Sequence, residues 1–122
     1  MRIFEFIERA RLNREQRDLL SDVARLAVQY SDGEGESVQN PIIINNARFD
    51  LEGTAAEFAW LIRRFGTMGL DWRVRSHGGA ARDVRKIDRI VIVVRDVGER
   101  TVFFDITESC GKWPSRDSYP PA

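Results

Sequence analysis

Two apolar segments close to the C-terminal end constrain the fold of this chain most strongly. Strands are expected at 87–95 and 101–107, joined by a turn over 96–100. Side chains alternate across a pleated strand, so each segment presents two faces. One face carries Ile90, Ile92, Val94, Val102, Phe104 and Ile106. The other carries Val91, Val93 and Phe103. One face must form the core, and the second is predicted to be a binding surface or to be covered by another part of the chain.

The length and composition predict one globular domain. The chain has 122 residues, of which 43% are apolar and 31% are charged, and a chain of this size can form a core without disulfides or metals. We expect a single α+β domain over 1–107 and a partly ordered tail over 108–122, with Trp113 docked on the domain. The single Cys110 excludes an intramolecular disulfide and a Cys-rich zinc site. No run approaches the ~18 apolar residues of a membrane span. A cytoplasmic protein with no cofactor, no metal and no membrane contact is expected.

Three segments have the apolar periodicity of helices. Residues 3–12 fit a helical stripe, although a short strand is also compatible with them. Residues 14–30 continue such a stripe, and Asn13 with Gln16 has capping-box spacing. A further helix should begin at Ala55, after the capping residue Thr54, and end at Gly66 or Gly69.

Two more strands complete the predicted sheet. Residues 41–45 are rich in isoleucine, and residues 70–75 alternate between apolar and charged side chains. Residues 76–82 are expected to form a flexible connection. The fold class is therefore α+β, with a mainly antiparallel sheet of about four strands and two or three helices packed mostly on one face. The predicted core includes Ile44, Leu61, Trp72, Ile92 and Phe104.

The second face of the hairpin is the main candidate for function. An apolar centre of Val91, Val93 and Phe103 with a rim of Arg73, Arg89 and Arg95 has the composition of a protein interface. We expect a small non-enzymatic interaction protein of the inhibitor, immunity or adaptor type, which binds a protein partner or a second copy of itself. Coverage of this face by residues 1–12, by one of the helices or by the C-terminal tail is the alternative.

Two other functions compete with this prediction. The net charge is zero, but residues 31–59 are acidic and residues 63–95 are rich in arginine. A GC-rich genome is an alternative explanation of the arginine content. An anion or nucleic-acid site is the first alternative, formed by Arg73, Arg75, His77, Gly78, Gly79 and Arg82. No Walker or GxGxxG pattern supports it. A small enzyme is the second, with His77, Cys110 and either Asp71 or Asp105. Catalysis needs a base within hydrogen-bond reach of the thiol, and sequence does not supply that distance.

Overall fold

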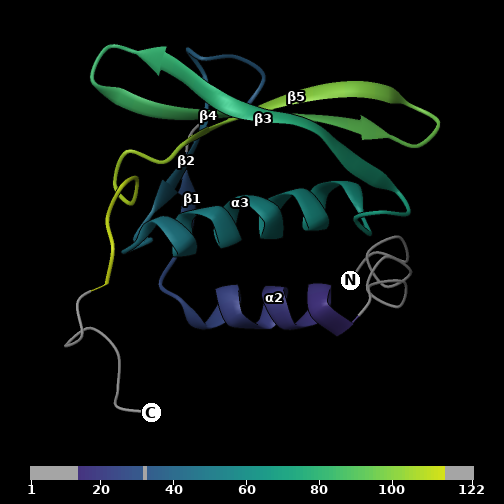
Figure 1. Ribbon diagram of the computed structural model, residues 1–122, viewed down its shortest axis with the longest axis horizontal. Coiled ribbons are helices and arrows are strands. Elements are labelled where there is room, and N and C mark those ends of the chain that lie inside the picture. Colours follow the sequence, from purple (N-terminus) through teal and green to yellow (C-terminus); the bar gives the residue numbers. More distant parts are fainter. Residues whose placement is uncertain (1–13, 32, 115–122) are drawn as a thin grey trace.

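The computed structural model describes residues 14–31 and 33–114 (Figure 1). The helix expected at 3–12 lies outside these residues. Two helices are present in the described part, α2 (Arg14–Arg25) and α3 (Asp50–Phe65). The strands are β1 (Gln29–Ser31), β2 (Ile42–Asn45), β3 (Trp72–Arg82), β4 (Arg85–Val94) and β5 (Gly98–Asp105). Neither helix is long and apolar enough to cross a bilayer.

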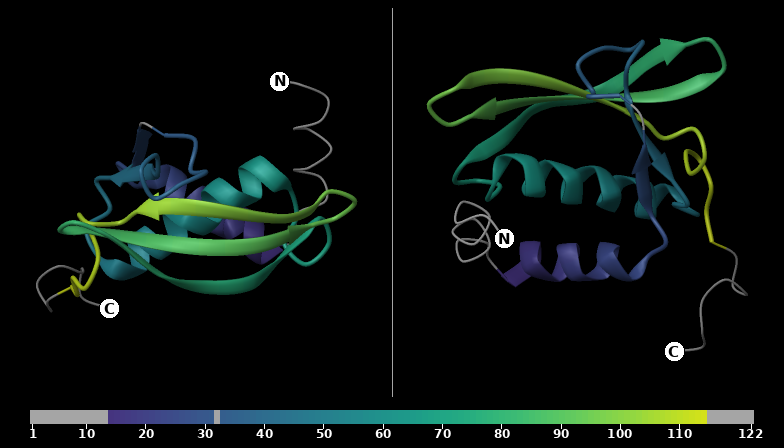
Figure 2. Two further views of the ribbon diagram at one scale, coloured as in Figure 1. Left: turned by 90° about the horizontal axis from the view of Figure 1, so that it is seen from above. Right: turned by 180° about the vertical axis from the view of Figure 1, so that it is seen from behind.

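The five strands form one mixed sheet in the order β1-β2-β5-β4-β3. Neighbouring strands are antiparallel, except that β2 and β5 run parallel. Both helices lie on the same side of the sheet, with α3 between the sheet and α2 (Figures 1 and 2). The predicted class, an α+β domain with a mostly antiparallel sheet and helices on one face, is confirmed.

The core lies between the sheet and α3. Ile44, Leu61, Trp72, Ile92 and Phe104 belong to one buried cluster, as predicted. The Trp60 ring packs edge-on against Phe104, with 5.5 Å between the ring centroids. Ile90 and Ile92 are fully buried, whereas the intervening Val91 is half-buried. The alternation read from the sequence therefore separates the two faces of the sheet correctly.

The first described helix is shorter than its apolar stripe predicts. It ends at Arg25, and Gln29–Ser31 pairs with β2 as an edge strand. The Tyr30 hydroxyl donates a hydrogen bond of 2.6 Å to the carbonyl of Ala56, and burial raises the pKa of Tyr30 to about 12. Sheet pairing thus prevails over helical periodicity at this end, because a strand partner satisfies the backbone groups equally well.

The second helix starts earlier than predicted. It begins at Asp50 after Phe49, which provides no side-chain cap, and Thr54 lies inside the helix. The Asp50 N–H donates to the carbonyl of Lys112, far away in the sequence, so a tertiary contact replaces the local cap. The helix ends at Gly66 as predicted, with a φ of 101°.

Two further expectations are wrong. Residues 76–82 are not a flexible connection, because β3 continues through them and Gly78 and Gly79 pair with Arg89 and Asp88. Trp113 does not dock on the domain, since 77% of it is exposed.

Candidate functional site

The sheet face that points away from the helices gathers the residues predicted to bind a partner. We call Val91, Val93, Phe103, Arg73 and Arg89 the outer patch. Arg73 lies opposite Val93 in the β3–β4 ladder, and Arg89 lies opposite Phe103 in the β4–β5 ladder. The three apolar side chains are half-buried, whereas both arginines are exposed. The five residues therefore form one surface of three neighbouring strands.

The arginines of this region differ in their partners. Arg75 forms an ion pair of 2.6 Å with Glu99. Arg95, the third predicted rim residue, lies in the turn after β4 and is 3.9 Å from the carboxylate of Asp96. Over 14–31 and 33–114, no ion pair engages Arg73 or Arg89. The outer patch thus presents two uncompensated positive charges beside its apolar centre.

Neither α2 nor α3 covers the outer patch, because both lie on the other side of the sheet (Figure 2). The segment 33–40 runs along the neighbouring edge of β5, where the N–H of Phe103 donates to the carbonyl of Gly35 at 2.8 Å. This segment borders the patch on the β5 side.

The residues of the alternative anion site do not come together on one surface. Gly78 and Gly79 are strand residues with ordinary φ angles, so they form no loop of convergent amides. Arg73 projects to the outer face, whereas His77 projects toward the helices. The side chain of Arg82 lies outside the described part. The described members therefore offer no shared anion cradle.

A β-bulge in β3 explains the direction of His77. Val74 pairs with Ile92, but Ser76 pairs with Val91, so Arg75 is one extra residue in the ladder. Beyond the bulge, the alternation is reversed, and His77 lies opposite the fully buried Ile90. Without the extra residue, His77 would share the outer face with Arg73, because one residue of slip exchanges the faces of a strand.

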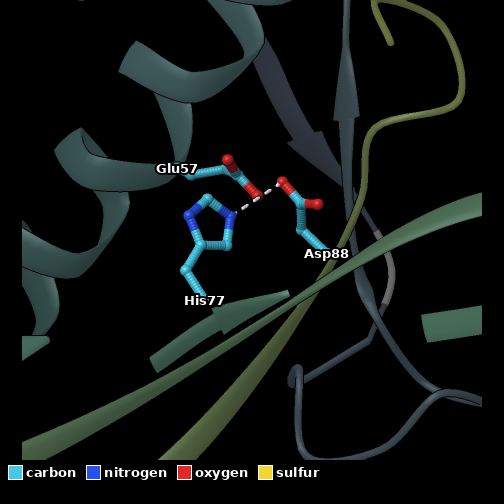
Figure 3. Close-up of side chains that lie close together, drawn as sticks. All are labelled: Glu57, His77 and Asp88. Atoms are coloured by element: carbon cyan, nitrogen blue, oxygen red, sulfur yellow. Dashed lines mark hydrogen bonds and ion pairs between the residues drawn. The ribbon is translucent and has the colours of Figure 1, made fainter. Parts of the chain in front are cut away.

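The bulge places His77 beside two carboxyl groups. Asp88 of β4 and Glu57 of α3 meet it between the sheet and the helix (Figure 3). His77 Nε2 lies 3.3 Å from Asp88 Oδ2. One ligand atom from each of the three residues lies within 4.8 Å of the other two. We call Glu57, His77 and Asp88 the inner cluster.

Glu57 is the least expected member of the inner cluster. It is fully buried, and neither carboxylate oxygen has a hydrogen-bond donor among the described residues. Burial, with a smaller contribution from the neighbouring carboxyl group of Asp88, raises the pKa of Glu57 to about 10. Glu57 is therefore neutral at physiological pH unless a cation takes the place of its proton.

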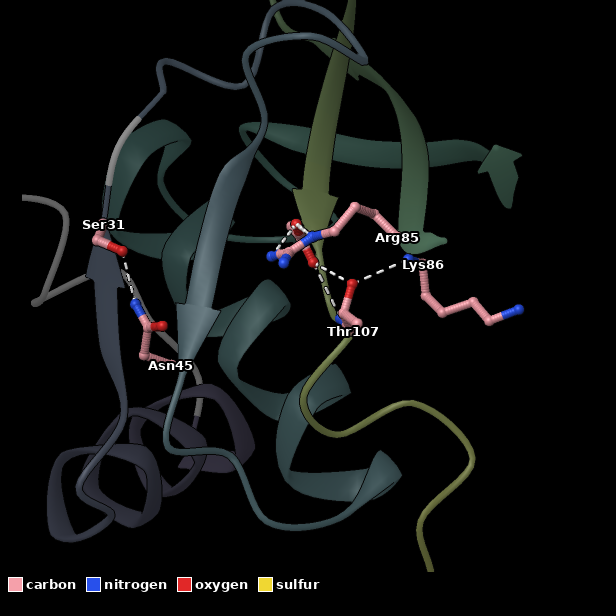
Figure 4. A network of polar contacts seen from close by, with 6 residues as sticks. Ser31, Asn45, Arg85, Lys86 and Thr107 are labelled. Carbon is pink, nitrogen blue, oxygen red and sulfur yellow. Dashed lines mark hydrogen bonds and ion pairs between the residues drawn. The ribbon is translucent and has the colours of Figure 1, made fainter. Parts of the chain in front are cut away.

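Asp105 of β5, the other buried carboxylate among the described residues, has both charge and hydrogen-bond partners. Asp105 forms a 2.6 Å ion pair with Arg85 and accepts hydrogen bonds from the N–H and hydroxyl of Thr107 (Figure 4). The Thr107 hydroxyl in turn accepts from the N–H of Lys86. Figure 4 also shows the hydrogen bond from Asn45 to Ser31, which joins β2 to β1. Glu57 thus contrasts with Asp105, which has both charge and hydrogen-bond partners.

A cavity of about 230 Å³ opens beside the inner cluster. Its lining residues are Asp50, Gly53, Thr54, His77, Asp88, Ile106, Ser109 and Cys110. A Cβ at Gly53 would lie 2.3 Å from Ser109 Oγ, so any larger residue in this wall would displace the Ser109 side chain. His77 and Asp88 line this cavity, whereas Glu57 is not among its lining residues.

The structure brings together only some of the residues that were predicted to form an enzyme site. His77 and Cys110 do line one cavity, but the acid that pairs with His77 is Asp88. Asp71 accepts the N–H of Thr67, and Asp105 pairs with Arg85. No hydrogen bond between Cys110 and His77 is present in the described part, so the geometry does not assemble a thiol with its base.

Glu57 and Asp88 are not among the predicted site residues, although the sequence contains a pattern that indicates them. Asp88 has the same strand parity as Ile90 and Ile92, which places its carboxylate on the core face. Glu57 lies on the buried side of α3, four residues before the buried Leu61. A charge on a core face indicates a site, because burying an unpaired charge is costly.

Comparison with protein-family models, with curated proteins and with solved structures gives no match.

Proposed function

We propose that this chain is a non-enzymatic protein-binding domain, and that its outer patch binds a partner with acidic residues around an apolar contact. The supporting observation is the pair Arg73 and Arg89, which have no ion pair in the described part and lie directly opposite Val93 and Phe103. An apolar contact with charges at its margin has the composition of a transient interface.

The chemistry of the patch favours an acidic protein over a nucleic acid. Nucleic-acid affinity depends on the number of phosphates that are neutralised, and this face offers two unpaired arginines, while Arg75 is held by Glu99. Stacking of bases needs several exposed aromatic rings, and Phe103 is the aromatic residue of the patch. An acidic partner would compensate both arginines and bury the valines together with Phe103.

The test compares three proteins on one immobilised support. They are the parent, the double variant V93S/F103A, and a control variant, Leu51→Ala, whose exposed side chain lies on α3. Partners from the native cell that bind parent and control but not V93S/F103A are then purified. We expect the affinity of such a partner to fall by more than about tenfold in V93S/F103A, because binding energy concentrates in buried aromatic anchors.

A charge reversal then tests the acidic character of the partner. Arg73→Glu with Arg89→Glu should abolish binding, whereas the parent complex should weaken as salt is raised. Equal binding by all variants would contradict the proposal. Loss of a dimer mass in V93S/F103A would identify the occupant as a second copy, and saturable binding of oligonucleotides with a steep salt dependence would support the alternative function.

A further inference from the structure

The inner cluster lies on the helix side of the sheet, so an inference about it is independent of the outer patch. Three elements supply its members, since Glu57 comes from α3, His77 from β3 and Asp88 from β4 (Figure 3). Such convergence needs the bulge at Arg75, without which His77 would face outward. Bulges recur next to functional sites, where they re-aim a side chain.

The burial of Glu57 without a hydrogen-bond donor indicates a ligand-binding position. Its carboxyl group is completely enclosed and lacks a donor among the described residues, although Asp105 in the same fold is paired with Arg85 and Thr107. An unpaired carboxylate in an apolar environment is strongly destabilising, and proteins retain such groups when they are paired or when they coordinate metals. The Glu57 carboxyl group points at His77 and Asp88, which are themselves ligand types.

The distances fit a single ion. Zn²⁺ binds imidazole nitrogen and carboxylate oxygen at about 2.0–2.2 Å in tetrahedral geometry, so two ligands of one ion lie about 3.3–3.6 Å apart. His77 Nε2 and Asp88 Oδ2 already have this spacing at 3.3 Å, and all three ligand atoms of the cluster lie within 4.8 Å of one another. A shift of about 1 Å in the side chains would bring all three to the spacing of a tetrahedral ion.

We propose that Glu57, His77 and Asp88 bind one divalent transition-metal ion. The donor set of one imidazole and two carboxylates suits Zn²⁺ or Mn²⁺. The two carboxylates balance the charge of a divalent ion, so the ion compensates the negative charge buried at Glu57. Three protein ligands leave at least one coordination position. His77 and Asp88 share the lining of one cavity with Thr54, Ser109 and Cys110, so a further ligand could enter from there.

His77 makes the test direct, because it is the only histidine of the chain. Untagged protein is treated with a chelator, dialysed, and titrated with Zn²⁺ while the imidazole resonances are followed by NMR. We expect the single set of ring signals to move to a new position that saturates at one equivalent, together with a rise in melting temperature. Unmoved His77 signals at about a hundredfold excess of Zn²⁺ would overturn the proposal.

Three variants separate this site from adventitious binding. Glu57→Gln and His77→Gln each remove one ligand with little change in volume. Asp83→Asn is the matched control, because it removes an exposed carboxylate in the β3–β4 turn and has a φ of 52°, which Asn tolerates. Affinity for Zn²⁺, measured by competition with a chromophoric chelator, should fall by more than about tenfold in both cluster variants and stay unchanged in D83N.

The same affinity in the parent and in both cluster variants would show that the metal binds elsewhere. Circular dichroism establishes whether each variant is folded, and the titration of the parent protein gives a decision even if one variant is not. A partner lost only in V93S/F103A leaves this inference untouched, since the outer patch and the inner cluster lie on opposite faces.

Discussion

Polar side chains in apolar surroundings indicate where single residues of this domain have a special role. Glu57 is a carboxyl group without a donor partner in the described part of the chain, yet it sits among the apolar residues of α3. Tyr30 also has a polar group in partly buried surroundings, and its hydroxyl donates a hydrogen bond to the carbonyl of Ala56. The difference is that a hydroxyl can donate to a backbone carbonyl, whereas an ionised carboxylate can only accept.

The proton on Glu57 predicts how the metal-free protein responds to pH. The pKa of Glu57 is about 10 in the folded state and near 4.5 in the unfolded state, so between these values the folded state holds one more proton. The free energy of unfolding should therefore fall as pH rises from about 5 to 9, with a slope of up to about 1.4 kcal/mol per pH unit from this group. Below the unfolded pKa the contribution is fully present.

Glu57→Gln should flatten this dependence, because glutamine carries no titrating proton. Urea unfolding of both proteins, measured with chelator present at several pH values, tests it. Two parallel stability curves would show that Glu57 has an ordinary pKa in the folded protein.

The elements of this fold are bounded by tertiary contacts as much as by local sequence. The start of α3 is fixed by the hydrogen bond from Asp50 to Lys112, and the end of α2 is fixed by the pairing of Gln29–Ser31 with β2. The end of α3 has a local cause, which is the backbone of Gly66. Its φ of 101° and ψ of −151° lie in a region that residues with a side chain rarely adopt.

Gly66→Ala should destabilise the protein by about 1–3 kcal/mol. An added Cβ would be strained and would lie 2.5 Å from the Asp71 carboxylate, which accepts the N–H of Thr67. Gly69→Ala is the control, since its φ is also positive but no atom lies within 4 Å of the added Cβ. Thermal unfolding should show a larger loss for G66A than for G69A, and equal losses would exclude the contact with Asp71 as a cause.

At the scale of the molecule, both described helices lie on one side of the sheet, and α3 separates the sheet from α2 (Figure 1). This asymmetry gives the two faces of β4 opposite roles. Ile92 is completely buried against the helices, and its neighbour Val91 belongs to the outer patch. The same substitution at adjacent positions therefore probes both faces.

Ile92→Asp should abolish cooperative folding, because a carboxylate without a partner in the core costs several kcal/mol, which is comparable with the stability of a small domain. Val91→Asp should leave a cooperative melt, since its side chain reaches solvent on the open face. A cooperative transition near that of the parent in I92D would contradict the assignment of the core face. Loss of folding in both variants would mean that the outer face is also covered.

The sequence by itself determined the sidedness of the hairpin, the strand at Ile42–Asn45 and the core, and it limited the end of α3 to Gly66 or Gly69. These follow from alternation, periodicity and backbone freedom, which are local properties. The tertiary structure alone decided the start of α3, the conversion of Gln29–Ser31 into a strand, and the inner cluster. The bulge at Arg75 is the clearest case. One extra residue in a ladder leaves no mark in the alternation of β3 itself, because its position depends on the partner strand. It nevertheless decides that His77 lies beside Glu57 and Asp88 and not on the outer face of the sheet.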